Sequence, residues 1–147
     1  MIVQIIMALF GTIAFSVLFG APAKYYVHCG IVGAAGWFLY LLLTRYAGIS
    51  VVMATFFSAL LVIVMARFFA VLEKCPATVF VIAGIFPLIP GAGICWAVYY
   101  IVTNQLADAL DSGLTALKSV IAIVLGIIIV FDLPKRLFGM KQNRRKG

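Results

Sequence analysis

Five long apolar blocks, separated by short breaks, make up most of this chain. They cover residues 1–19, 26–43, 48–69, 77–102 and 112–131. A helix needs roughly 20 apolar residues to cross a bilayer, so these lengths suit one crossing each. Hydrophobic residues amount to 66% and charged residues to 10%, whereas soluble domains average about 45–50% and about 25%. The sequence therefore predicts an all-α membrane protein, a bundle of about five transmembrane helices within residues 1–134.

Other fold classes fit the blocks poorly. The blocks are longer than barrel strands and lack the alternation between lipid-facing and lumen-facing residues. The sequence contains no segment that reads as a soluble domain, a linker or a low-complexity tract. We therefore expect one membrane domain followed by a basic cytoplasmic tail over residues 135–147.

Basic residues are concentrated toward one predicted side of the membrane. Six of the eleven Lys and Arg residues lie within residues 135–147. Five crossings with the N-terminus outside also place Lys24, Arg67 and Lys74 on the inner side, and leave Arg45 and Lys118 toward the outer side. Because inner segments of membrane proteins are enriched in Lys and Arg, we expect an N-out, C-in protein of the inner (cytoplasmic) membrane. No recognisable nucleic-acid-binding fold surrounds these charges, so nucleic acid is not an expected partner.

The first block has one competing interpretation. Ala21-Pro22-Ala23 resembles the small-residue cleavage site of a signal peptide. However, no Lys or Arg precedes Lys24, so the basic start of a signal peptide is missing. Cleavage would also place the basic tail outside. We therefore expect the first block to remain as a transmembrane helix.

The fourth block is interrupted by a proline- and glycine-rich stretch, Gly84-Ile85-Phe86-Pro87-Leu88-Ile89-Pro90-Gly91-Ala92-Gly93. A proline removes a backbone donor and clashes with the carbonyl four residues earlier. Pro87 and Pro90 are therefore predicted to break the helix, with a second half-helix starting near Gly91–Gly93. Its first amides would lack helical partners and suit a carboxylate, as in transporters with broken helices. We expect Pro87, Pro90, Gly91, Ala92 and Gly93 to bind substrate; the alternative is a kink that serves packing alone.

The fifth block carries a polar face. Asp108, Asp111, Thr115, Lys118 and Ala122 are spaced by three or four residues, which places them on one side of a helix, with Ser112 and Ser119 beside them. A lysine inside a membrane helix costs roughly 2.5–3.5 kcal/mol at the bilayer centre. Lys118 is expected to pair with Asp108 or Asp111 or to bind a substrate anion; the alternative is that it snorkels to the headgroups. Asp108 and Asp111 are candidates for ion coupling.

Few residues offer other chemistry. His28 is the one histidine, and its side-chain type suits a proton switch, which makes it a third candidate for ion coupling. The three cysteines form no CxxC pair, so neither a disulfide framework nor a metal site is predicted. We found no HExxH, GxSxG or P-loop motif. We therefore expect no cofactor and no enzymatic activity.

Small residues mark the second block. Gly30, Gly33, Ala34 and Gly36 are spaced so that neighbouring helices can approach closely. We interpret them as packing positions rather than as a binding site.

Three segments together resemble a known family. They are Phe19-Gly20-Ala21-Pro22, the stretch Pro87-Leu88-Ile89-Pro90-Gly91-Ala92-Gly93 ahead of Tyr99-Tyr100, and Ser112-Gly113-Leu114-Thr115-Ala116-Leu117-Lys118. In order and hydropathy nearly the whole chain resembles the threonine/serine exporter (ThrE-type) family, specifically the small C-terminal-half subunit of its two-component form.

The resemblance implies an exporter subunit that acts with a larger membrane partner. The implied cargo is a small carboxylate metabolite: threonine, serine or a dicarboxylate such as succinate. The family supplies no binding residues that we carry over. The competing functional hypothesis is a non-transporting assembly or scaffold subunit that stabilises its partner.

Overall fold

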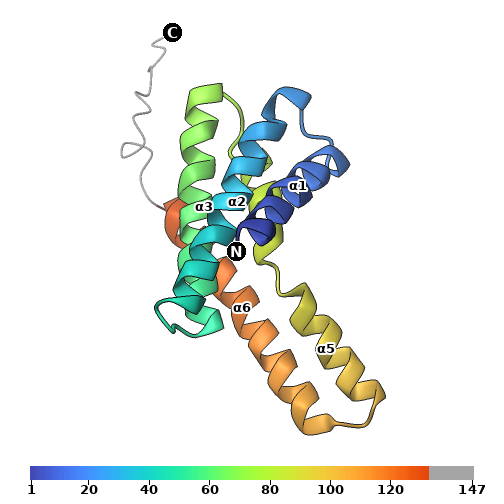
Figure 1. Cartoon of the computed structure of the whole chain (residues 1–147). Coiled ribbons are helices and arrows are strands. Elements are labelled where there is room, and N and C mark those ends of the chain that lie inside the picture. Colours follow the sequence, from blue (N-terminus) through green and yellow to red (C-terminus); the bar gives the residue numbers. More distant parts are fainter. Residues whose placement is uncertain (133–147) are drawn as a thin grey trace.

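The computed structural model describes residues 1–132; the predicted basic tail lies outside them. All regular structure within the described residues is helical, which confirms the predicted fold class (Figure 1). The elements are α1 (Ile2–Leu18), η1 (Ala23–Tyr25), α2 (Tyr26–Arg45), α3 (Val51–Glu73), α4 (Thr78–Ile85), η2 (Phe86–Leu88), α5 (Gly91–Val102) and α6 (Leu106–Asp132).

Three continuous segments are long and apolar enough to cross a membrane: Ala23–Arg45, Val51–Glu73 and Leu106–Asp132. A fourth candidate crossing is the pair Thr78–Leu88 and Gly91–Val102, which meet at an angle of 45°. The predicted break in the fourth block is therefore confirmed. α1 has 17 residues, or about 25 Å at ~1.5 Å per residue, a little less than the bilayer's hydrocarbon core. The fifth crossing and the N-out orientation stay predictions.

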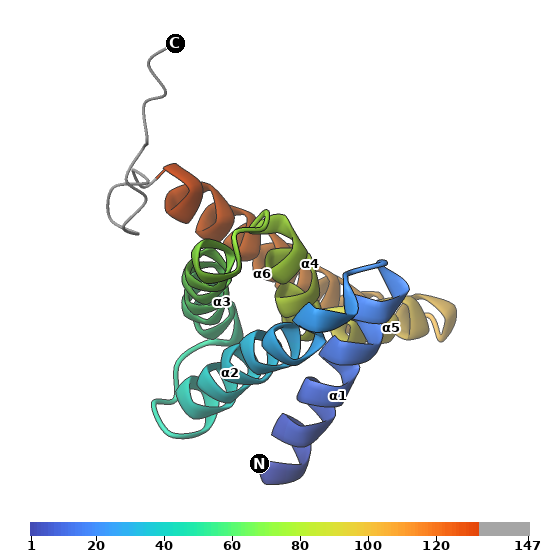
Figure 2. The same ribbon diagram turned by 90° about the horizontal axis from the view of Figure 1, so that it is seen from above.

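The core of the bundle lies where α2, α3 and α4 meet, with α1 packed along α2 (Figure 2). Glycines allow this approach. A Cβ on Gly33 would lie 2.1 Å from the Thr12 hydroxyl, and a Cβ on Gly36 would lie 2.3 Å from a methyl of Val62. Both separations are far below van der Waals contact, so only glycine fits at these positions. The predicted packing role of the small residues in the second block is confirmed.

Four buried hydroxyl groups are satisfied inside their own helices, whereas the buried Ser58 hydroxyl has no hydrogen-bond partner among the described residues. The side chains of Thr12, Ser16, Thr55 and Ser119 each donate to the carbonyl four residues earlier, over 2.7–2.9 Å. Such local bonds let polar side chains enter an apolar core without unpaired groups, which are costly in lipid. The bundle can therefore carry hydroxyl groups at its helix contacts.

α6 packs on α3 through its second half. Gly126 lies against Ala59, where a Cβ would meet the Ala59 methyl at 3.5 Å. At the end of α6, the Arg67 guanidinium of α3 donates to the carbonyls of Val130 and Phe131. A cation there complements the partial negative charge of a helix C-terminus. These contacts hold α3 and the second half of α6 together.

α5 and the first half of α6 form a hairpin that points away from the other helices (Figure 1). No residue of α5 is buried, and within residues 1–132 the only substantial contact of α5 is with α6. The turn after α5 contains Asn104 at φ +61°, a left-handed conformation that asparagine adopts more readily than most residues. The hairpin therefore leaves the bundle at the proline break and returns to it along α6.

Candidate functional site

The break between α4 and α5 leaves two backbone amides without partners. After η2, Ile89 is extended and Pro90 precedes the first residue of α5. The Gly91 amide donates to the Ile89 carbonyl over 2.7 Å, and the Ile94 amide donates to the Pro90 carbonyl over 3.1 Å. Within the described chain no hydrogen bond uses the amides of Ala92 and Gly93. These are the free donors expected in the first turn of a helix.

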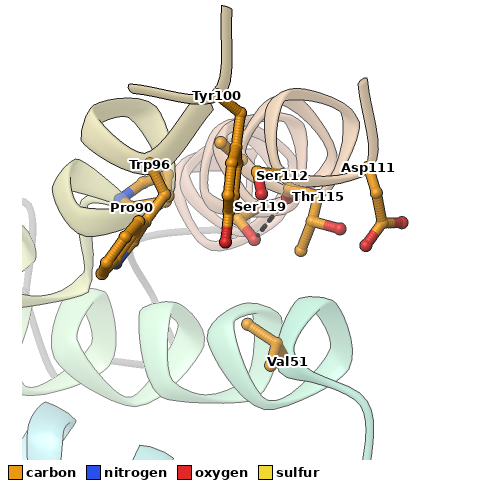
Figure 3. Close-up of a pocket in the computed structure, with 10 residues that line it drawn as sticks. Val51, Pro90, Trp96, Tyr100, Asp111, Ser112, Thr115 and Ser119 are labelled. Atoms are coloured by element: carbon orange, nitrogen blue, oxygen red, sulfur yellow. Dashed lines mark hydrogen bonds between the residues drawn. The ribbon is translucent and has the colours of Figure 1, made fainter. Parts of the chain in front are cut away.

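A cavity of about 360 Å³ lies beside this break, a size within the usual range for ligand pockets of about 300–1,000 Å³. Figure 3 shows the α5 side chains facing the polar side chains of α6, with the start of α3 below them. The lining residues are Val51, Pro90, Gly93, Trp96, Tyr100, Asp111, Ser112, Thr115, Ala116 and Ser119. The proline break and the polar face of the fifth block, predicted separately, thus border one cavity.

The sequence of α5 and α6 explains this juxtaposition. A Cβ on Gly93 would lie 3.4 Å from the Ala116 methyl, so small residues let the two helices approach at the start of α5. One turn later Trp96 and Tyr100 stack, with ring centroids 5.9 Å apart. Their rings form an aromatic wall opposite the hydroxyl groups of α6 (Figure 3).

Electrostatically the cavity has two different ends. In Figure 3, Pro90 and Trp96 lie at one side and Asp111 at the other, with Ser112 and Thr115 between them. The break contributes the partial positive charge of a helix N-terminus, whereas Asp111 contributes a carboxylate. The Ser119 hydroxyl is already bonded to the Thr115 carbonyl over 2.9 Å. The arrangement can hold a small polar molecule with a negative and a positive end.

The predicted site residues do not all meet here. Pro90, Gly93 and Asp111 line the cavity. Gly91 and Ala92, which lie between Pro90 and Gly93 in the sequence, form the start of α5. Pro87 lines a separate apolar pocket of about 310 Å³, together with residues of α1 and Trp37. Asp108 lies in the exposed first turn of α6 and His28 lies in α2. The ion-coupling roles of Asp108, Asp111 and His28 stay predictions.

Lys118 is exposed and lies outside the cavity lining. Of the alternatives for this residue, the ion pair with Asp108 or Asp111 is absent from the described chain. The spacing explains why. Asp111 lies seven positions away, or about 10 Å along the helix at ~1.5 Å per residue, which exceeds the span of an ion pair.

The structure brings together several residues that the sequence did not single out. Trp96 had no assigned role, and Tyr100 was not singled out as a lining residue, yet both contribute to the cavity wall. Their spacing of four residues from each other is the signal that places them on one face of α5. His28 was treated without a partner, but Glu73 lies beside it, with 3.8 Å between Nε2 and Oε1.

The described residues hold no group of three or more His, Cys, Asp and Glu side chains arranged to bind a metal ion. The cysteines Cys29, Cys75 and Cys95 are free. Hydroxyl groups, backbone amides, the Trp96 indole N–H and the Asp111 carboxylate are the polar groups that the cavity offers to a ligand.

Comparison with known proteins gives one family. A family model described as "Threonine/Serine exporter, ThrE" matches residues 4–131, which is most of the chain and includes every residue of the cavity. No curated protein and no solved structure matches.

Proposed function

The chain belongs to the threonine/serine exporter (ThrE) family, and on this basis we propose that the cavity between α5 and α6 binds the exported amino acid. The protein is a multi-pass membrane protein of an exporter family. The observation that carries the proposal is that the broken crossing and the polar face of α6 border the same cavity.

The groups around the cavity complement an amino acid zwitterion. The free amides of Ala92 and Gly93 are donors for the cargo carboxylate, because the start of a helix favours anions. Asp111 at the other side is an acceptor for the cargo ammonium group. Hydroxyl groups of Ser112 and Thr115 are within the lining and suit the hydroxyl of serine or threonine.

Asp111 also bears on the choice of cargo. A dicarboxylate such as succinate would bring its second carboxylate toward Asp111, and like charges at close range repel. Threonine and serine bring an ammonium group instead. We therefore favour threonine or serine over a dicarboxylate as the cargo of this cavity.

A larger partner subunit remains part of the proposal. α5 has no buried residue and contacts little besides α6, so the hairpin that carries the cavity offers open surface to a second membrane protein. We propose an inner-membrane complex in which this chain supplies the cavity and the partner closes it. Lys118, exposed on α6, contributes positive charge near the cavity without lining it.

Replacing Asp111 by asparagine tests the cargo assignment. Asp111→Asn keeps the shape but removes the charge, so we expect serine and threonine export to fall about tenfold or more, as when a charged hydrogen bond to a ligand is lost. The measurement is export by cells that lack the native chain and express the variant with its partner. Asp132→Asn is the matched control, because Asp132 lies outside the cavity at the far end of the same helix.

One outcome would count against the proposal. Unchanged export by Asp111→Asn, with the variant present at normal level, would show that the cavity does not bind the exported amino acid. It would instead favour the scaffold hypothesis, under which the charge of a cavity residue is unimportant as long as the complex assembles.

A further inference from the structure

A cluster of ionisable side chains lies at the opposite end of α3 from the cavity. The Glu73 carboxylate is 3.8 Å from the His28 imidazole and 4.0 Å from the Lys24 ammonium group. Val51 at the start of α3 lines the cavity, whereas Glu73 is the last residue of α3. The separation is about 33 Å at ~1.5 Å per residue, so the cluster cannot touch cargo in the cavity.

The position of Glu73 is not explained by its own helix. A negative charge in the last turn of a helix is unfavourable, because the C-terminus already carries partial negative charge. α3 has no basic residue in that turn. The charge of Glu73 is instead complemented by the Lys24 ammonium group of η1, and the His28 imidazole of α2 lies beside the carboxylate. Glu73 therefore depends on groups from another helix, and a change in their charge alters the contact between α2 and α3.

The surroundings of His28 distinguish its two protonation states. Its ring packs edge-on against Phe69 and Phe80, with centroids 5.1 Å and 6.4 Å away. The Nδ1 atom is buried and has no hydrogen-bond partner within residues 1–132. A neutral imidazole can leave an acceptor nitrogen there, but an imidazolium carries N–H groups on both nitrogens. A buried N–H without an acceptor is unfavourable, so this conformation fits the neutral ring.

We propose that His28 and Glu73 form the proton-binding site that couples export to a proton gradient. The imidazole takes one proton from water, becomes an imidazolium paired with the Glu73 carboxylate, and returns that proton to water after the conformational change. The described conformation offers no acceptor to the second N–H. Protonation therefore favours a different conformation. A proton can drive a transport step only through such a difference between two conformations. The inference rests on the proposed export function.

A series of contacts connects His28 to the break at Pro90. Phe80 of α4 contacts the rings of His28, Phe69 and Tyr25. α4 leads directly through η2 to the break at Pro90. A shift of the aromatic contacts around His28 is thus transmitted to the segment that begins the cavity wall.

The other titratable or charged groups near His28 and Glu73 are Lys24, Tyr25, Cys29, Lys74 and Cys75.

The test separates transport that needs protons from transport that does not. The complex of this chain and its partner is reconstituted in liposomes, and two processes are measured: accumulation of serine driven by a pH gradient, and exchange of serine across the membrane without a gradient. For Glu73→Gln and His28→Gln we expect accumulation to fall about tenfold or more, within the usual range of coupling effects, while exchange stays within about twofold of wild type. Lys74→Gln, at the exposed neighbouring position, is the matched control and should keep both processes.

The remaining outcomes overturn the proposal or are decided by a second readout. Accumulation that survives in both variants shows that the pair carries no proton. Loss of both processes shows a structural role instead. If wild-type protein exchanges no amino acid, the proposed export function fails, and a second measurement, the titration of His28, tests the proton site by itself.

His28 is the one histidine of the chain, so its imidazole ¹⁵N signals can be followed from about pH 5 to 8. Different curves for wild type and Glu73→Gln support a shared proton site, and identical curves contradict it.

Discussion

Export should be lost when Pro87 and Pro90 are both replaced by alanine, although the protein still enters the membrane. Each proline lacks an amide hydrogen and obstructs the carbonyl four residues earlier. Alanine removes both obstacles and is about 3 kcal/mol more favourable than proline inside a helix. α4, η2 and α5 are then expected to merge into one continuous helix.

The expected loss follows from the backbone. In a continuous helix the amides of Ala92 and Gly93 would bond to the carbonyls of Leu88 and Ile89, and neither would remain free for cargo. The bend of 45° that leads α5 away from the bundle would also be reduced. Serine and threonine export should fall to background, whereas membrane insertion and helix content, measured by fractionation and circular dichroism, should stay normal.

Gly91→Ala is the control for this experiment. A Cβ at Gly91 would meet nothing within 4 Å among the described residues. The substitution keeps the backbone amides expected to bind cargo, so it adds a methyl group to the same segment without closing the break. We expect export by Gly91→Ala close to wild type. Full export by the Pro87→Ala/Pro90→Ala variant would show that the break serves packing and not cargo.

The second large effect concerns stability. A Cβ on Gly36 would lie 2.3 Å from a Val62 methyl group in the core between α2 and α3. Adding atoms to a filled core typically costs about 1–3 kcal/mol, and here the overlap forces the helices apart. We expect Gly36→Ala to lower the unfolding temperature of the purified protein strongly and to reduce its level in the membrane.

A compensating substitution makes this prediction specific. Val62→Ala removes the obstructing methyl group, after which the nearest atoms to the new Cβ lie at 3.8–3.9 Å. Gly36→Ala/Val62→Ala should therefore be more stable than Gly36→Ala alone. Gly126→Ala is the matched control, because its Cβ would meet its nearest neighbour at 3.5 Å, an ordinary contact. Equal stability of Gly36→Ala and Gly126→Ala would contradict the close approach of α2 and α3.

Much of the fold follows from local sequence. The long apolar blocks predict helices because no other structure satisfies the backbone in lipid, and Pro87 and Pro90 predict the break because proline cannot continue the hydrogen-bond pattern. The helix ends differ by a few residues from the predicted blocks. α3, for example, covers Val51–Glu73 rather than residues 48–69, since Ser50 caps its start by accepting from the Met53 amide.

Contacts between distant segments were harder to predict. Glu73 lies 45 positions from His28 in the sequence, and only the antiparallel packing of α2 and α3 around the turn at 46–50 brings them together. That pairing could have been derived, because residues about equally far from a tight turn face each other in a helical hairpin. The angle of α5 relative to α6 could not be predicted, since it depends on how Gly93 packs against Ala116.

The most direct test of the cargo site is the response of two backbone amides to cargo. With the chain and its partner in nanodiscs and ¹⁵N label in alanine and glycine, serine or threonine is titrated while the amide signals of Ala92 and Gly93 are followed. Both signals should shift in a saturable manner with one apparent Kd, while Ala97, one turn further along α5, changes little. Saturable binding of cargo that leaves the Ala92 and Gly93 signals unmoved would show that the broken helix does not hold the carboxylate.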